Sequence, residues 1–503
     1  MLRSHILFLE NRGFSVTPVT NAQDAVSLVG QDRFDIVFLD EMMPGMDGLA
    51  ALSAIKESDP SLPVVMITKS EEENLMEEAI GAKIDEYLTK PVNPSQILSS
   101  CKRILEKRKI SRDTITRKYT TEFSEITTLL DGAVSADGWI DIHVKLCERE
   151  LELDLHPDLG LQQTLQDQRR ECNQAFGRFI EEQYPAWIRS TERPFMSLDV
   201  IPKTVVPLFE SGRPVLFVVV DNLRLDAWLA IEPLLYDLFT VRRSCYYSIL
   251  PSATPFSRNA LFAGCFPSEI ETRFSDFWKS GEDDETSRNR HEQAFLAAQL
   301  GRLGVKFAQE TKYVKLMDPE EARNTAKNVA SFFRSPMTSM VFNFIDILAH
   351  KRSGSELLKE MVPDESAFRS LTRTWFEHSA LFHILRSASE ANVNVVLTSD
   401  HGSIRTMRGA TVHADRETST NVRYKSGRSI KADPKQAICV GDPKQFGLPS
   451  RGLNVNYLIA KEDYYFVYPT NYHKYLGLYR DSFQHGGVSL EEMVMPLVVM
   501  TER

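Results

Sequence analysis

The chain has 503 residues, 42% of them hydrophobic and 25% charged, and a formal net charge of −10 at pH 7. Because one hydrophobic core rarely serves so long a chain, we expect two or three globular units. The acidic balance argues against broad, nonspecific nucleic-acid binding, which relies on Lys and Arg neutralising phosphates. No apolar stretch is long enough to span a bilayer and no signal peptide begins the chain, so we expect a cytoplasmic protein. The six scattered cysteines form no C-x-x-C pair and are expected to be reduced.

Residues 6–107 alternate amphipathic helical stretches with short apolar runs, FDIVFLD at 34–40 and PVVMIT at 63–68. Helices that alternate with apolar strands are typical of parallel βα units. We therefore predict a small, doubly wound α/β domain over residues 1–108.

Three polar side chains follow the strands of this domain. Asp40 ends the run FLD ahead of EMMPGMDG, Thr68 ends the next run, and Lys90 follows YLT. This order resembles the flavodoxin-like receiver domain of response regulators. The resemblance implies that Asp40 accepts a phosphoryl group from a sensor histidine kinase and that Thr68 and Lys90 form the switch. An aspartate can accept a phosphoryl group only where groups such as Lys and Mg²⁺ neutralise the developing charge.

One feature of receivers is missing at the start of the sequence. Receivers begin with a strand and an acidic pair that holds Mg²⁺, whereas this sequence opens directly in the expected first helix. Mg²⁺ usually relies on one or two carboxylates, so phosphorylation depends on whether an intact acidic pair is present. A shortened chain, a misassigned start codon and genuine loss of phosphoacceptance all explain the pattern.

The remainder of the chain divides into a helical segment and a second α/β segment. Over 109–205 apolar residues recur at helical spacing, which predicts a helical-bundle connector. Over 206–503 the apolar runs PVLFVVVD, SMVFNFID, VNVVLTSD and MPLVVM predict an α/β domain. Open parallel sheets bind ligands outside the carboxyl ends of their strands, so the aspartates ending three of these runs predict one site. The Gly-, Pro- and Lys-rich region 402–450 is expected to form surface loops or insertions.

Aspartate and histidine occur together in three motifs of the second α/β segment. These are DILAH with Asp346 and His350, SDHG with Asp400 and His401, and QHGG with His485. A mixture of carboxylates and imidazoles suits zinc or manganese. If Asp346 opens a helix, His350 lies one turn later on the same face, and both can bind one metal. Taken singly, each of these residues could instead be a strand-end cap or a core histidine.

The order of these motifs after Asp221 and Thr254 resembles the alkaline phosphatase superfamily, and the ending HGGVSLEEMVMP resembles its PglZ branch. The resemblance implies two Zn²⁺ sites, with Mn²⁺ as an alternative. One site would comprise Asp346, His350 and His485. The other would comprise Asp221, Asp400, His401 and the oxygen of Thr254, which would be the nucleophile. Ser252 is the fallback nucleophile, while Arg258 and Asn259 could hold phosphate oxygens or serve as capping or surface residues.

Receiver, helical connector and PglZ-like domain in this order resemble the PorX-type response regulators. The resemblance implies control of type IX protein secretion, an extracytoplasmic-function sigma factor or secretion-motor component as partner, and a phosphorylation-promoted homodimer without membrane insertion. It also implies a phosphodiesterase that acts on linear or cyclic oligoribonucleotides. A metal-stabilised signalling scaffold without turnover, or hydrolysis of a phosphomonoester or sulfate ester, are the alternatives. Basic residues between 401 and 435 could bind a polyanion or belong to a solvated loop.

Overall fold

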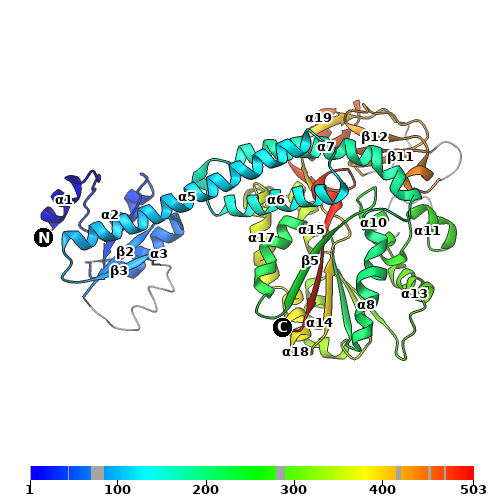
Figure 1. The fold of residues 1–503 in the computed structure, drawn as a ribbon, viewed down its shortest axis with the longest axis horizontal. Helices are drawn as coiled ribbons and strands as arrows, with labels where there is room; N and C mark the ends of the chain where they lie inside the picture. Colours follow the sequence, from blue (N-terminus) through cyan, green and yellow to red (C-terminus); the bar gives the residue numbers. More distant parts are fainter. Residues whose placement is uncertain are drawn as a thin grey trace. The chain divides into compact units, whose positions relative to one another are not determined.

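The computed structural model describes residues 2–43, 45–69, 84–278, 289–414, 421–450, 455–469 and 472–503. The chain forms two compact units, Met1–Thr121 and Glu122–Arg503 (Figure 1). Within the described ranges, no helix has both the length and the apolar character needed to cross a membrane. The expected domain boundaries at residues 108 and 205 remain predictions.

The first unit is built on the parallel strands β1 Val37–Asp40, β2 Val64–Thr68 and β3 Glu86–Thr89. The strands are accompanied by α1 Leu2–Glu10, α2 Ala22–Val29, α3 Gly48–Ser58 and the start of α5 Pro94–Leu130. Apolar side chains of α2, α3, β1 and β2 form a buried core. Such burial is expected for short apolar strands that pack against helices. The predicted receiver fold is thereby confirmed.

Three long helices follow the receiver sheet in the sequence: α5, α6 Ala136–Asp154 and α7 Gln162–Arg189. Helix α6 begins after the N-cap Ser135, whose side chain accepts a hydrogen bond from the Gly138 amide. Helices α6 and α7 pack through aromatic side chains, with the rings of Trp139 and Phe176 edge to face at 5.4 Å. Helix α5 begins in the first unit and ends in the second, whereas α6 and α7 lie entirely in the second. The predicted helical character of this segment is confirmed.

Among the described residues, a six-stranded sheet of order β5-β16-β8-β4-β7-β6 runs through the second unit. The strands are β4 Val215–Val220, β5 Thr240–Tyr247, β6 Lys312–Leu316, β7 Met337–Phe342, β8 Asn394–Thr398 and β16 Val494–Thr501. Strand β4 is parallel to its neighbours β7 and β8, and β16 is antiparallel to β8 and β5. The residues that follow β4, β7 and β8 therefore meet at one edge of the sheet.

Helices cover both faces of this sheet (Figure 1). Along β4, Leu216 and Val218 join one large apolar cluster, while Phe217 contacts Phe262 of α10 at a ring separation of 6.0 Å. This alternation follows from the two-residue period of a strand. The helices are α8 Val206–Leu208, α9 Leu225–Ile231, α10 Thr254–Ala263, α11 Pro267–Arg273, α13 Glu292–Arg302, α14 Pro319–Lys327, α15 Phe344–Gly354, α16 Glu356–Met361, α17 Glu365–Glu377 and α18 Ala380–Glu390.

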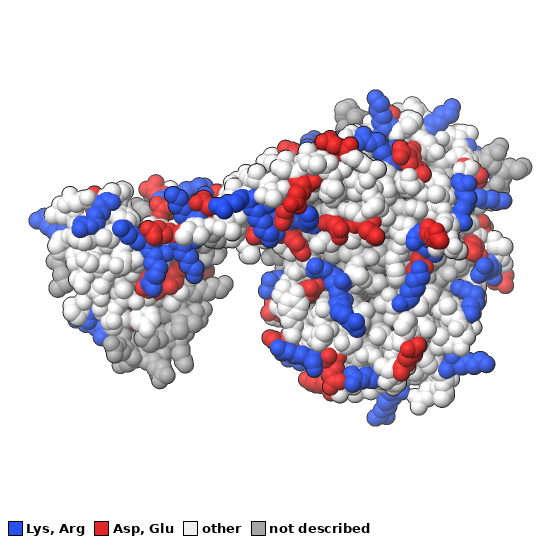
Figure 2. Space-filling view, in the orientation of Figure 1, with Lys and Arg blue, Asp and Glu red and all other residues white. Residues whose placement is uncertain are grey.

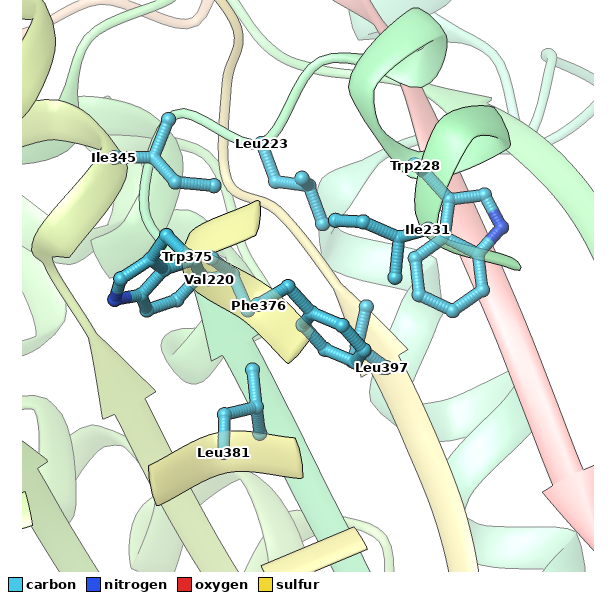
Figure 3. Close-up of a pocket in the computed structure, with 9 residues that line it drawn as sticks. All are labelled: Val220, Leu223, Trp228, Ile231, Ile345, Trp375, Phe376, Leu381 and Leu397. Atoms are coloured by element: carbon cyan, nitrogen blue, oxygen red, sulfur yellow. The ribbon is translucent and has the colours of Figure 1, made fainter. Parts of the chain in front are cut away.

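An apolar pocket lies in the core between the sheet and α9, α15, α17 and α18 (Figure 3). Its lining consists of Val220, Leu223, Trp228, Ile231, Ile345, Trp375, Phe376, Leu381 and Leu397. Val220, Ile345 and Leu397 lie one to three residues ahead of the candidate ligands in the sequence. An apolar lining cannot bind a phosphate group, so the pocket belongs to the packing that positions the ligand-bearing elements.

Where residues 402–450 are described they include several strands, so the prediction of surface loops was wrong there, while the alternative of an insertion stays a prediction. In the described part of this region and the segment after it, β10 Arg408–Thr411 pairs with β14 Tyr464–Val467, and β11 Tyr424–Gly427 and β12 Ala437–Val440 pair with β13 Asn456–Ala460. Strand β9 Ile404–Thr406 pairs with β15 Ser482–Gln484, and α19 Tyr472–Tyr479 and α20 Leu490–Met493 flank β15 in sequence. Strands of three to five residues are too short to show a clear alternation in the sequence. They nevertheless bury a separate apolar cluster that includes Ala410, Leu458 and Phe466.

Candidate metal centre

Asp346, His350 and His485 converge on one point. Helix α15 places Asp346 in its first turn and His350 one turn later, so both side chains leave the same face. Nε2 of His350 lies 3.4 Å from Oδ1 of Asp346 and 3.1 Å from Nε2 of His485, which is itself 3.6 Å from Oδ1 of Asp346. Ligand atoms about 2.0–2.2 Å from a tetrahedral zinc ion lie about 3.3–3.6 Å apart. The three atoms therefore have nearly the spacing of zinc ligands.

Asp221, Asp400 and His401 form a second cluster beside Thr254. Asp221 follows β4, and Asp400 and His401 follow the neighbouring strand β8. Nε2 of His401 lies 3.5 Å from Oδ1 of Asp221 and 3.8 Å from Oδ2 of Asp400. The same nitrogen is 2.9 Å from Oγ1 of Thr254, the first residue of α10. The structure thus brings together the seven predicted ligands, whose roles stay predictions.

The chemistry of the second cluster fits a cation. Asp221 is 1% exposed and Asp400 is fully buried. Oδ1 of Asp221 and both carboxylate oxygens of Asp400 accept no hydrogen bond from the described residues. Burial, together with the neighbouring Asp221 carboxylate, raises the pKa of Asp400 well above its usual range. Because buried carboxylates without hydrogen bonds are costly unless a positive charge compensates them, these oxygens fit a metal ion.

The two clusters are neighbours, and Thr254 is the hydroxyl that faces them. The rings of His401 and His485 stack at a centroid distance of 4.2 Å. The fallback nucleophile, Ser252, instead donates its hydroxyl to the carbonyl oxygen of Gly487 at 2.7 Å. The geometry therefore favours Thr254 over Ser252 as the reactive hydroxyl.

Arg258 is a buried cation beside the second cluster, so the predicted surface role for it was wrong. Its Nη1 donates to Oδ2 of Asp221 at 2.5 Å and lies 3.7 Å from Oδ2 of Asp400. Asn343 donates to the same Asp221 oxygen at 2.9 Å. Asp221 is thus left with Oδ1 as the oxygen that can bind a metal. Arg258 follows Thr254 by four residues in α10, and this helical spacing is the only sequence signal that could have found it.

Glu292 holds Arg258 from the other side. Nε of Arg258 donates to Oε1 of Glu292 at 2.7 Å, the Asn289 amide donates there at 2.8 Å, and the Tyr313 hydroxyl donates to Oε2. Burial acts to raise the pKa of Glu292, but Arg258, Lys315 and the Tyr313 hydroxyl together lower it below its usual range. Asn289 also donates to the carbonyl oxygen of Thr254 at 3.2 Å. This network anchors the start of α10, and no local motif predicts it because its members come from separate segments.

Two glycines beside the histidines allow close backbone approach. Gly486, directly after His485, has a φ of +114°, and a Cβ there would lie 2.8 Å from the Tyr424 ring. A Cβ on Gly402, directly after His401, would lie 2.0 Å from the carbonyl oxygen of Glu491. Side chains at these two positions would displace the loops that carry the histidines.

In the first unit, the three predicted receiver residues lie at the carboxyl ends of adjacent strands. Asp40 ends β1, Thr68 ends β2 and Lys90 follows β3. Nζ of Lys90 is 2.5 Å from Oδ2 of Asp40, and the Thr68 hydroxyl donates to the Glu41 carboxylate. The phosphoacceptor role of Asp40 and the switch roles of Thr68 and Lys90 stay predictions.

Family models identify the three parts of the chain. The BREX system PglZ alkaline phosphatase-like domain matches residues 200–500, which is more than half of the chain. The chain belongs to the PglZ alkaline phosphatase-like family. Ahead of the PglZ domain, the response regulator receiver domain matches residues 1–102 and the PorX response regulator linker domain matches residues 109–188. The protein is therefore a two-component response regulator of the PorX type.

Curated relatives match about a fifth of this PglZ-family protein. Regulatory protein VanRc of Enterococcus gallinarum is 32% identical over 100 residues, which are 20% of this chain and 43% of VanRc. Sensor protein GacS of Pseudomonas syringae pv. syringae is 37% identical over 94 residues, which are 18% of this chain and 10% of GacS. The chain thus spans less than half the length of either relative. A CheY-like receiver domain protein from Methanospirillum hungatei JF-1 is 24% identical with a TM-score of 0.21, covering 22% of this chain and 88% of that one.

The described basic residues after His401 include both arginines in ion pairs and the exposed Arg428, Lys431 and Lys435. Three ion pairs lie within the second unit: Arg405 with Asp481, Arg408 with Asp463 and Arg423 with Glu492. Arg416 lies outside the described residues. On the face shown in Figure 2, Lys and Arg are interspersed with Asp and Glu. These contacts favour a structural role for the paired arginines over polyanion binding.

Proposed function

We propose that this cytoplasmic response regulator controls type IX protein secretion and that its PglZ domain is a zinc-dependent phosphodiesterase. The observation that carries the proposal is the pair of adjacent ligand clusters with the Thr254 hydroxyl 2.9 Å from His401. Two metal sites beside a hydroxyl suit in-line displacement at phosphorus. We further propose that the substrates are linear or cyclic oligoribonucleotides, as the resemblance to the diesterase branch implies.

Asp346, His350 and His485 would hold one Zn²⁺, and Asp221, Asp400, His401 and Thr254 would hold the other. Bound zinc would lower the pKa of the Thr254 hydroxyl, neutralise the phosphoryl oxygens and steady the leaving oxygen.

Thr254 would act as the nucleophile. Its Oγ1 would release its proton to water and form a bond to phosphorus, while the bond from phosphorus to the leaving oxygen breaks and that oxygen takes up a proton from water. Water would then attack the phosphothreonine, releasing a phosphomonoester and restoring the hydroxyl. Arg258 and Asn289 would keep the start of α10, and hence Thr254, in place during both steps.

Hydrolysis of matched nitrophenyl esters tests this proposal. We expect the zinc-loaded protein to hydrolyse the phosphodiester faster than the phosphomonoester or the sulfate, and to cleave a short oligoribonucleotide. Thr254→Ala should lose at least about 1,000-fold in kcat/KM. The matched control Ser257→Ala, which removes a buried hydroxyl that donates to the Ala253 carbonyl on the same helix, should retain most activity.

Two results would contradict parts of the mechanism. Full hydrolysis by Thr254→Ala, with none by Asp346→Ala, would exclude the covalent step and leave the metal sites standing. Preference for the monoester or the sulfate would exclude the diesterase assignment.

A metal-stabilised signalling scaffold without turnover is the second candidate. It is favoured by the burial of the second cluster, in which Asp221, Asp400 and His401 are at most 1% exposed. Stoichiometric zinc combined with no turnover of any tested ester would support the scaffold and contradict the hydrolase.

We also propose that Asp40 is phosphorylated by a sensor histidine kinase, with Mg²⁺ bound where an intact acidic pair is present. Phosphorylation would promote a homodimer and binding to an extracytoplasmic-function sigma factor or a secretion-motor component. Sedimentation with and without a small-molecule phosphodonor and Mg²⁺ tests the first step. A monomer under both conditions, despite a phosphate measured on Asp40, would contradict phosphorylation-promoted dimerisation.

A further inference from the structure

The last linker helix, α7, presents one continuous face to the PglZ domain. Its buried residues include Arg169, Asn173, Phe176, Ile180 and Tyr184. They are spaced three or four residues apart, which places them on a single side of the helix. Among these side chains, Arg169, Asn173 and Tyr184 make polar contacts with segments that lead to the candidate metal centre.

The first contact is with α20, which lies close to the two loops that carry His401 and His485. Arg169 Nη1 donates to Glu491 at 2.7 Å, and the Asn173 amide donates to both Glu491 oxygens at 3.2 and 3.0 Å. Oδ1 of Asn173 accepts the amide of Leu490 at 2.8 Å. Asn173 therefore binds both the side chain and the backbone of this short helix, which fixes its orientation as well as its distance from α7.

Helix α20 in turn holds the loops that carry His485 and His401. Oε1 of Glu492 accepts the amide of Gly487 at 2.8 Å, two residues after His485. The carbonyl oxygen of Glu492 accepts the amide of Gly402 at 3.2 Å, directly after His401. A shift of α20 would therefore move one histidine from each ligand cluster.

The second contact holds the loop that leads to the nucleophile. The Tyr184 hydroxyl accepts the amide of Leu250 at 2.9 Å, four residues ahead of Thr254. Tyr184 is fully buried and its ring stacks on Phe446 at 5.7 Å, so the hydroxyl has little freedom to follow a moving loop. Tyr184, which binds the nucleophile loop, thus lies fifteen positions after Arg169 in α7.

We infer that α7 is a positioning element of the metal centre, with Asn173 and Tyr184 setting the spacing between the two histidine loops and the nucleophile loop. This inference deepens the proposed hydrolase and rests on it for its effect on turnover. It makes the linker segment a structural part of the PglZ site. Neither residue touches the ligand clusters directly, so each acts through the loop that it holds.

Two variants test the inference in the full-length protein. Tyr184→Phe removes the hydroxyl and keeps the ring, and Asn173→Ala removes the side-chain hydrogen bonds to Leu490 and Glu491 of α20. The matched control is Tyr247→Phe, which removes another buried hydroxyl, one that donates to the Ala136 carbonyl at 2.6 Å without holding a ligand-bearing loop. Each tyrosine variant removes one hydrogen bond of similar worth, so general destabilisation should be comparable for these two variants.

The readouts are amide hydrogen exchange, zinc affinity by chelator competition, and kinetic constants. Tyr184→Phe should raise exchange over residues 248–256 by about 3- to 10-fold, and Asn173→Ala should do so over residues 484–492. Asn173→Ala should also weaken zinc binding by about 10-fold, and both variants should lower kcat more than they raise KM. Tyr247→Phe should leave loop exchange and zinc affinity unchanged.

The outcomes separate this inference from the proposed hydrolase. If both variants match the Tyr247→Phe control in loop exchange and zinc affinity, the positioning role is overturned. If the unmodified protein hydrolyses no ester but the variants still loosen the loops and weaken zinc binding, positioning stands and the hydrolase fails.

Discussion

Replacing Arg258 with methionine should lower the free energy of unfolding of the second unit and yet increase its affinity for zinc. Arg258 is 1% exposed and contacts three buried carboxylates, on Asp221, Glu292 and Asp400, at 2.5, 2.7 and 3.7 Å. Removing one partner of a buried ion pair costs about 3–5 kcal/mol, which we expect for the metal-free protein. With zinc bound to Asp221 and Asp400, only the contact with Glu292 is left uncompensated, at about 1–3 kcal/mol.

The difference of about 2 kcal/mol fixes the change in zinc affinity. By linkage, a variant that loses less stability with metal than without must bind that metal about 30-fold more tightly. Urea unfolding of the second unit, with chelator and with saturating zinc, measures the two losses. Chelator competition measures the affinity independently.

Arg369→Met provides the matched control. Arg369 is also buried, but its partners Glu150, Asp154 and Asp226 belong to neither ligand cluster. Its replacement should cost the same stability with and without zinc. An equal loss of stability for Arg258→Met with and without zinc, or weaker zinc binding, would refute the reasoning. In that case the Arg258 guanidinium would not supply the positive charge beside Asp221 and Asp400 when metal is absent.

Further predictions concern the linker contact, the receiver and the core. Burial acts to raise the pKa of Glu491, but Arg169, His143 and Arg224 together lower that pKa to about 2. The ionised Glu491 therefore stabilises the fold above pH 4.5, and this contribution, about 3 kcal/mol, is lost as pH falls towards 2. Urea midpoints of metal-free Glu491→Gln, measured against pH, should lack this acid-dependent part. Lys90→Met should lower the free energy of unfolding by less than about 1 kcal/mol, because the ion pair of Lys90 with Asp40 is partly exposed. The same variant should nevertheless abolish phosphate uptake from a small phosphodonor. Unchanged uptake, measured by mass spectrometry, would contradict the switch role. Leu397→Ala, in the apolar pocket of Figure 3, should lower the free energy of unfolding by about 2–5 kcal/mol, and a loss under 1 kcal/mol in denaturant titration would show that this wall is not tightly packed.

Much of the fold was predictable because its signals are local. The apolar runs before Asp40, Asp221 and Asp400 are strands, and the carboxyl ends of neighbouring parallel strands must meet. Likewise the i+4 spacing of Asp346 and His350 required only that a helix begin nearby, and α15 does so two residues ahead of Asp346. Local periodicity and strand-end placement together were enough to gather the ligands.

The surroundings of the ligands were not predictable in the same way. Arg258 reaches Asp221 and Glu292 across 37 and 34 positions, and α7 reaches Glu491 across more than 300. Such partners depend on how whole elements pack, which no spacing rule encodes. The small sheets after residue 402 were missed because their strands are too short. A strand is recognised from apolar and polar side chains that alternate over a longer run of residues.

Metal content tests the central claim most directly. Elemental analysis of the full-length protein should find two zinc or manganese ions per chain. His350→Ala should retain only one, because the proposed ligands of the other site, Asp221, Asp400, His401 and Thr254, do not include it. Thr254→Ala should keep at least the ion held by Asp346, His350 and His485. A protein that contains no metal after purification and binds none in titration, or a His350→Ala variant with unchanged content, would contradict the two-site account.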